Sequence, residues 1–210
     1  MSAPAASDPL HRSGDATSPS DPSPLLPGDA LPRRGGAAQS AGPTSIVGPA
    51  AFFERLQQSA SGPASSLALL IVDINGFHVI NQAHGYLVGD RFLEMVGSRL
   101  ANRLRGEDLA TRLGGDEFAV LLADVFDSAS AMAAARETLR AFNDPFQLND
   151  RPHAVAAHVG VSLSPAHGRD VRTLLYAARA ALRSAKEAGL DVVVAQPGGH
   201  DAWTSSPPLL

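Results

Sequence analysis

The chain has 210 residues, a length that suits one ordinary domain with loose ends better than two domains. Seventeen Lys and Arg residues against 21 Asp and Glu residues give a net charge of −4, which argues against a protein held to nucleic acid through many phosphate contacts. Cysteine is absent, so disulfide scaffolds, thiolate zinc sites and cysteine nucleophiles are excluded. The N-terminus does not show the charged and then apolar segments of a signal peptide, and neither terminus has the roughly 20 apolar residues of a membrane span. We therefore expect a cytoplasmic protein without such a span.

Composition divides the chain into three parts. Residues 1–43 contain 8 of the 16 prolines, 5 of the 19 glycines and no Phe, Trp or Tyr, too little apolar surface to offset the loss of chain entropy on folding. We predict a disordered N-terminal arm there, which is a candidate site for a protein partner, and a flexible C-terminal tail over residues 196–210. The folded domain is expected over residues 44–195, long enough to bury about 70 % of its unfolded surface.

The first half of this domain shows three signals in chain order. The apolar run Leu67–Val72 predicts a buried central strand that ends at Asp73. An apolar residue at every fourth position predicts a helix from about Gly89 to Arg105. Two short strands, Leu109–Leu113 and Phe118–Leu122, flank a Gly-Gly turn and predict a hairpin.

The second half alternates helix and strand. A helical stripe runs from Met132 to Phe142, a strand covers Val155–Leu163, a helix covers Val171–Glu187, and Val192–Val194 is a closing strand. This order predicts an α/β sandwich in which helices flank a central mixed sheet.

Acidic residues gather where these elements end. Asp73 follows the first strand, where α/β sheets commonly place ligand groups, and Asp116 and Glu117 sit at the tip of the hairpin. If the two strands are neighbours, three carboxylates come within a few ångström, and they require a cation to stay ionised. Mg²⁺ is the expected ion, since it takes hard oxygen ligands and leaves positions open for phosphate. The alternative is ordinary turn chemistry at the hairpin and a strand-end cap at Asp73.

Three motifs in order carry a resemblance to a known family. The hairpin string Arg112–Phe118, RLGGDEF, resembles the signature of the GGDEF family of diguanylate cyclases. The segment Val72–Asn81 is similar to the family's first-strand and helix motif, and residues 181–189 look like its last-helix motif. Together they cover about residues 44–195. The resemblance implies a ferredoxin-like, palm-type fold.

It also implies an activity. Family members condense two GTP molecules into cyclic di-GMP and pyrophosphate, with Mg²⁺, or Mn²⁺ as an alternative. Each domain of a homodimer holds one GTP, and each 3′-hydroxyl attacks the other nucleotide's α-phosphate. We therefore expect GTP as substrate, cyclic di-GMP as product and inhibitor, and a homodimer for catalysis.

Carried onto this sequence, the resemblance assigns metal binding to Asp73, Asp116 and the backbone carbonyl of Ile74. Asp116 and Glu117 are the catalytic pair, and one of them would help to deprotonate the attacking hydroxyl. The turn glycines let the backbone approach the phosphates, where a side chain would collide. These are Gly114 and Gly115.

Further positions would bind guanine, triphosphate and product. Asn81 and Asp90 would hydrogen-bond the guanine edge, although such residues are more often helix caps or first-turn acids. Lys186 would reach the triphosphate, although an exposed lysine is common near a helix C-terminus. Arg105 and Asp108 resemble the RxxD inhibitory site that binds cyclic di-GMP, although they also fit a surface ion pair.

Several positions depart from the family. His78 stands where members carry a phosphate-contacting lysine, and a neutral imidazole supplies less charge there. Tyr86 replaces a histidine, and Leu190 replaces an arginine, so that a second phosphate contact is missing. The other replacements are Asn75 for an acid, Arg179 for Asp, Arg183 for Tyr and Asp191 for Asn.

These departures keep two rivals open. One is a catalytically weak or inactive module that binds cyclic di-GMP through Arg105 and Asp108 and reports it to a partner. The other is a different nucleotide cyclase or polymerase-like activity on a palm-type fold, against which the guanine pair argues. The remaining histidines show no zinc spacing, and we interpret them as surface or satisfied core groups.

Overall fold

The computed structural model describes residues 46–62 and 66–196, and the predicted arm over residues 1–43 and nearly all of the predicted tail lie outside them. In chain order the elements are α1 (Pro49–Ser61), β1 (Leu67–Ile74), α2 (Phe77–His84), α3 (Tyr86–Ala101), β2 (Leu109–Gly114), β3 (Glu117–Ala123), α4 (Ser128–Leu139), the 3₁₀ turn η1 (Arg140–Phe142), β4 (Phe146–Leu148), β5 (Arg151–His153), β6 (Ala157–Ser164), α5 (Val171–Ala188) and β7 (Val192–Val194). No helix among these described residues is long and apolar enough to cross a bilayer.

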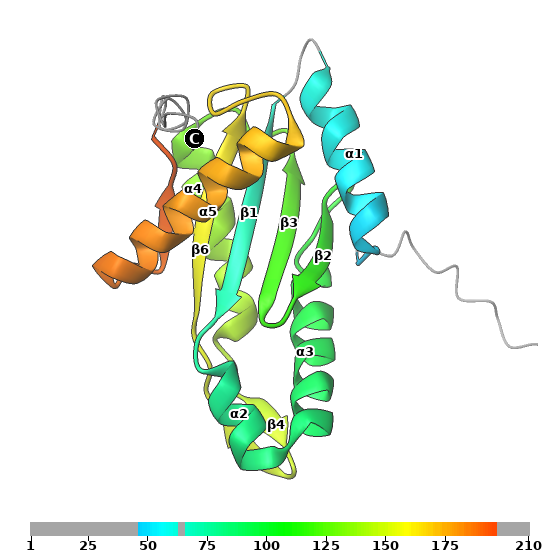
Figure 1. Cartoon of the computed structure of the whole chain (residues 1–210), viewed down its shortest axis with the longest axis vertical. Helices are drawn as coiled ribbons and strands as arrows, with labels where there is room; N and C mark the ends of the chain where they lie inside the picture. Colours follow the sequence, from blue (N-terminus) through cyan, green and yellow to red (C-terminus); the bar gives the residue numbers. More distant parts are fainter. Residues whose placement is uncertain (1–45, 63–65, 197–210) are drawn as a thin grey trace, which may run out of the picture. The chain divides into compact units, whose positions relative to one another are not determined.

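A five-stranded sheet of order β2-β3-β1-β6-β7 forms the centre of the domain (Figure 1). β1 pairs antiparallel with both β3 and β6, while β6 and β7 are parallel. The sheet is therefore mixed, as predicted. β1 is buried along nearly its whole length, which is why its sequence is a continuous apolar run rather than an alternation.

The two faces of the sheet have separate cores. Leu67, Leu69 and Ile71 of β1 pack in the cluster that includes residues of α1 and α5, and the intervening residues pack in the cluster that includes α3 and α4. Since side chains alternate along a strand, the Asp73 side chain points to the same face of the sheet as Leu69 and Ile71, which is the face covered by α5. Glu117 does the same on β3, where Ala119 and Leu121 belong to that cluster.

Helix α5 crosses β6 and β1 on this face (Figure 1). It begins at Asp170, whose side chain accepts a hydrogen bond from the Thr173 N–H at 3.0 Å, a regular N-cap. Its approach to the sheet depends on Gly160 of β6, because an added Cβ there would lie 2.1 Å from the Ala178 carbonyl oxygen. The glycine thus lets α5 lie close to the strands, within reach of their acidic ends.

The structure differs from the predicted elements at several points. The helix expected from Gly89 to Arg105 is α3, which begins and ends earlier, and α2 is a separate helix before it. The break falls at Gly85, with φ of 83°, a backbone conformation that favours glycine. The β4–β5 hairpin was not predicted, because three-residue strands are too short to show a period.

Candidate functional site

The acidic ends of β1 and β3 lie side by side. Asp73 and Glu117 are register partners in the antiparallel ladder, and the Ile74 N–H donates to the Asp116 carbonyl oxygen at 3.3 Å. The sequence prediction required these two strands to be neighbours, and that condition is confirmed. The pairing therefore brings the end of the first strand and the hairpin tip to one edge of the sheet.

Two cations of α5 meet these acids. The Lys186 ammonium lies 2.6 Å from the Asp73 carboxylate. The Arg179 guanidinium forms a two-pronged contact with Glu117, with Nε and Nη2 at 3.2 Å and 2.7 Å from the two carboxylate oxygens. The two cations are seven residues apart, close to two helical turns, and so they share one face of α5.

The expected metal-holding cluster of Asp73, Asp116 and Glu117 is not formed in the part of the chain that the structure describes. Within residues 46–62 and 66–196, no group of three His, Cys, Asp or Glu side chains is arranged to hold a metal ion. Asp73 and Glu117 are instead compensated by Lys186 and Arg179. Mutual repulsion is thus relieved by side-chain cations, a possibility that strand-end spacing alone did not reveal.

The oxygen donors assigned to Mg²⁺ by the resemblance are two carboxylates and one carbonyl, so a third acid is not required. Hard oxygen donors in small number fit this ion, which keeps other positions for water and phosphate. The Asp116 carboxylate makes no hydrogen bond or ion pair with any other described residue, and the Asp73 side chain is about one-fifth exposed. The donor set therefore fits Mg²⁺ chemically.

The hairpin turn has an open backbone. Gly114 and Gly115 have φ of 148° and 55°, and no atom lies within 4 Å of where their Cβ atoms would be. Arg112 clamps the turn by donating from Nε to the Gly115 carbonyl oxygen at 3.0 Å, and its Nη1 lies 3.9 Å from Asp90. Sequence reasoning missed this role of Arg112, although its place at the start of the RLGGDEF string was a usable signal.

The two residues predicted to bind guanine lie on α2 and α3. A Cβ added to Gly89 would lie 1.9 Å from Asn81 Oδ1, so the Asn81 side chain occupies the space left by the glycine next to Asp90. Asn81 Oδ1 is buried and has no hydrogen-bond partner among the described residues. A buried acceptor without a donor is uncommon in folded proteins, and here it is compatible with a ligand donor.

Three of the positions that depart from the family supply no cation to this edge, whereas Arg179, a fourth, does. His78, Tyr86 and Leu190 are exposed. The side chains at these positions form no ion pair with any residue that the structure describes. The Leu190 carbonyl lies 2.9 Å from His158 Nδ1, which is a backbone contact only.

Arg105 and Asp108 form a tight turn before β2. The two Asp108 carboxylate oxygens accept from the Arg105 and Ala123 backbone N–H groups, each at 3.0 Å. The Arg105 side chain is exposed and pairs with no other described residue. Both residues, with Arg103, line a cavity of about 320 Å³ between this turn, β3 and α4.

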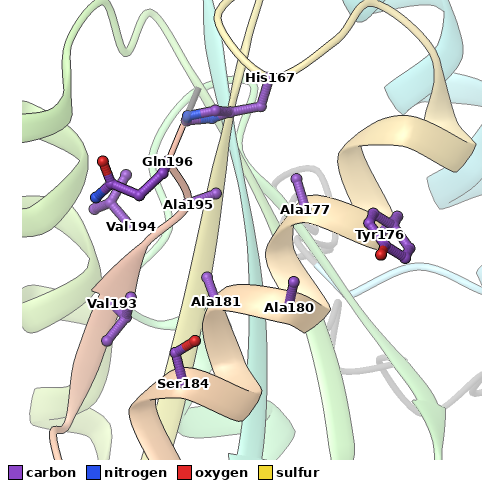
Figure 2. Close-up of a pocket in the computed structure, with 10 residues that line it drawn as sticks. All are labelled: His167, Tyr176, Ala177, Ala180, Ala181, Ser184, Val193, Val194, Ala195 and Gln196. Atoms are coloured by element: carbon purple, nitrogen blue, oxygen red, sulfur yellow. The ribbon is translucent and has the colours of Figure 1, made fainter. Parts of the chain in front are cut away.

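A second cavity of about 380 Å³ lies between α5 and β7 and contains none of the predicted site residues (Figure 2). His167 at its edge is buried, and its Nδ1 accepts from the Leu163 N–H at 2.8 Å. Burial lowers the pKa of His167. The interpretation of this histidine as a satisfied core group is confirmed.

Known proteins that resemble this chain contain the same type of domain. The family model described as "Diguanylate cyclase, GGDEF domain" matches residues 44–191. Diguanylate cyclase TpbB of Pseudomonas aeruginosa strain UCBPP-PA14 is 36 % identical over 141 residues, which are 65 % of this chain and 32 % of that protein. The bifunctional diguanylate cyclase/cyclic di-GMP phosphodiesterase MucR of P. aeruginosa is 33 % identical over 137 residues, or 65 % of this chain and 20 % of MucR.

Among solved structures, the crystal structure of the GGDEF domain of P. aeruginosa TpbB superposes with a TM-score of 0.68 and 32 % identity, covering 73 % of this chain and 98 % of that one. The predicted fold class, a palm-type sandwich with a central mixed sheet, is thereby confirmed. This chain spans between a fifth and a third of the length of the curated relatives named above.

Proposed function

This chain belongs to the GGDEF family, and from that premise we propose that it is a diguanylate cyclase that converts two GTP molecules into cyclic di-GMP and pyrophosphate. The observation that carries the proposal is the register pairing of Asp73 with Glu117, which brings the first-strand acid and the GGDEF hairpin to one edge of the sheet. A dimer is required because each domain would hold one GTP, and the two nucleotides react with each other.

Metal binding is assigned to the Asp73 and Asp116 carboxylates and the Ile74 carbonyl, with Mg²⁺ as the ion and Mn²⁺ as an alternative. When bound, the ion would neutralise charge that develops on the phosphates. Lys186 would then release Asp73 and bind phosphate oxygens, which the short reach between the two groups supports. The open backbone at Gly114 and Gly115 would accept the triphosphate.

The chemical step occurs twice: the 3′-oxygen of each GTP bonds to the α-phosphorus of the other, and the bond from that phosphorus to the oxygen bridging to the β-phosphate breaks. Two pyrophosphates leave, and each hydroxyl proton passes to a carboxylate. Both oxygens of Glu117 are held by Arg179, whereas the Asp116 carboxylate has no partner in the described part of the chain. We assign the proton to one of these two carboxylates, Asp116 or Glu117.

Guanine would be recognised by Asn81 and Asp90. The unpartnered Asn81 Oδ1 offers an acceptor to a guanine N–H donor, and the Asp90 carboxylate adds a second acceptor whose position Arg112 restrains. Adenine lacks the ring N–H and amino donors of this edge, so GTP is favoured over ATP. His78 would contribute at most a weak phosphate contact.

The decisive experiment incubates the purified chain with GTP and Mg²⁺ and separates the products by chromatography. Cyclic di-GMP and pyrophosphate are expected, and the Asp116→Ala variant should form neither. ATP in place of GTP tests the guanine assignment. A chain that makes no cyclic di-GMP even at high protein concentration would not be a cyclase.

A second candidate function is binding of cyclic di-GMP, either as product feedback or as an effector without catalysis. It is favoured by the cavity beside Arg105 and Asp108, where an exposed guanidinium stands next to a fixed carboxylate. Titration with cyclic di-GMP should give saturable binding that Arg105→Ala abolishes. Arg136→Ala, which removes an exposed arginine of α4 outside this cavity, is the matched control.

A further inference from the structure

We propose that Arg179 binds the triphosphate of the nucleotide beside Lys186. The inference rests on the proposed function, because it concerns how the same site holds GTP. Arg179 stood out in the sequence only as a departure from the family, and the structure places its side chain on Glu117 of the signature hairpin.

The two cations of α5 contact neighbouring acids. Arg179 and Lys186 are separated by about 10 Å along the axis of α5, yet their head groups contact Glu117 and Asp73, which are register partners. Register partners in an antiparallel ladder have Cα atoms only about 5 Å apart. The two cationic groups therefore converge on one short edge of the sheet, where a single chain of phosphates can meet both.

The Arg179 side chain can exchange its carboxylate partner for a phosphate. The Arg179 side chain is 54 % exposed, and exposed ion pairs contribute little net stability. A guanidinium presents a planar fork of donors that matches a phosphate as well as a carboxylate. Arg179 therefore loses little when it turns from Glu117 to phosphate oxygens, which carry more negative charge.

The positive charge available at this edge of the sheet also favours Arg179. Among the described residues, the side-chain ion pairs to the strand-end acids Asp73 and Glu117 come from Lys186 and Arg179 alone. His78 and Leu190 offer no fixed positive charge. Arg179 is thus the side chain placed to compensate a polyanion together with Lys186.

The test measures binding rather than turnover. Isothermal titration calorimetry of the full chain with Mg²⁺ compares a non-hydrolysable α,β-methylene GTP analogue with GMP. Arg179→Gln should weaken binding of the triphosphate analogue about tenfold, as expected for loss of a charged hydrogen-bond pair, and leave GMP binding unchanged. Arg179→Lys, which keeps the charge, should restore part of the affinity.

Arg172→Gln is the matched control. Arg172 is an exposed arginine two turns before Arg179 on the same helix, and this substitution removes the same charge. The Arg172→Gln variant should bind both ligands like the unaltered chain. Equal or tighter binding of the triphosphate analogue by Arg179→Gln would overturn the proposal, and so would equal weakening of both ligands. An unaltered chain that binds neither ligand would refute the proposed function itself, and this inference with it.

Discussion

At the ends of β1 and β3, carboxylates pair with side-chain cations from a helix far along the chain, whereas at the turn before β2 the Asp108 carboxylate accepts from backbone N–H groups. Asp73 and Glu117 hold Lys186 and Arg179. Asp108 instead bonds the N–H groups of Arg105 and Ala123. A side-chain cation can leave its carboxylate by rotating about its own bonds. A backbone N–H group can leave Asp108 only if the turn opens.

This difference separates acids that are available to a ligand from acids that hold the fold. The Lys186 and Arg179 side chains are about half exposed and can reach other partners in solvent, so their ion pairs with Asp73 and Glu117 can exchange at low cost. A carboxylate bonded to backbone donors restrains the chain, and its loss leaves those donors unsatisfied. The comparison therefore predicts that substitutions at the two places separate activity from stability.

The largest effect is expected for Asp73→Asn. It removes one charge of the proposed metal ligands and the partner of Lys186, and it should lower the rate of cyclic di-GMP formation at least about 100-fold. The rate is measured by chromatography with GTP and Mg²⁺. Asp144→Asn, at an exposed acid outside the site, should keep full activity. An active Asp73→Asn variant would contradict the role given to this edge.

The next effect concerns guanine recognition. Gly89→Ala places a Cβ where Asn81 Oδ1 now lies, so the Asn81 side chain must move, and the preference for GTP over ATP analogues should fall about tenfold. Competitive binding measures this preference. Gly97→Ala is the matched control in the same helix, because its Cβ would meet the nearest atom at an ordinary 3.7 Å. Equal preferences in the two variants would remove Asn81 from the guanine site.

These contacts also show how far the sequence could be read. The apolar run before Asp73 and the Gly-Gly turn were strong local signals, and they predicted a central strand and a hairpin that the structure confirms. Their pairing brought Asp73 beside Glu117. The face on which the acids emerge was not predictable, because β1 is apolar on both faces.

The pairing of Arg179 with Glu117 was not predictable in the same way. The two residues are 62 positions apart, and helical periodicity identifies the buried face of α5 without stating which strand lies beneath its edge. The contact depends on the close approach of α5 at Gly160, a tertiary feature. The bounds of α3 were also misplaced, because apolar periodicity locates a helix better than it locates the helix ends.

A smaller effect is expected at Asp108. Asp108→Ala leaves two backbone N–H groups without their acceptor and should lower the free energy of unfolding by about 1–2 kcal/mol. Urea denaturation measures this change. Glu107→Ala is the neighbouring control, because it breaks only the exposed ion pair with Arg55 and should have little effect. If both variants lose the same stability, an acid bonded to backbone N–H groups contributes no more to the fold than an acid in an exposed ion pair.

The smallest effect is expected at the N-cap of α5, where Asp170 is a second acid held by local donors. Hydrogen bonds from the Thr173 hydroxyl and N–H lower the pKa of Asp170 from its usual 3.8. Because the folded-state pKa lies below the unfolded value, the cap stabilises the fold fully above pH of about 4 and loses this contribution as the pH falls through the folded-state pKa. Asp170→Ala should therefore cost about 1 kcal/mol at pH 7, and the difference from the unaltered chain should shrink in more acidic urea titrations. Glu187→Ala, at an exposed acid near the other end of α5, should change the free energy of unfolding little. A difference at Asp170 that stayed constant down to pH 2 would mean that the cap does not act through its charge.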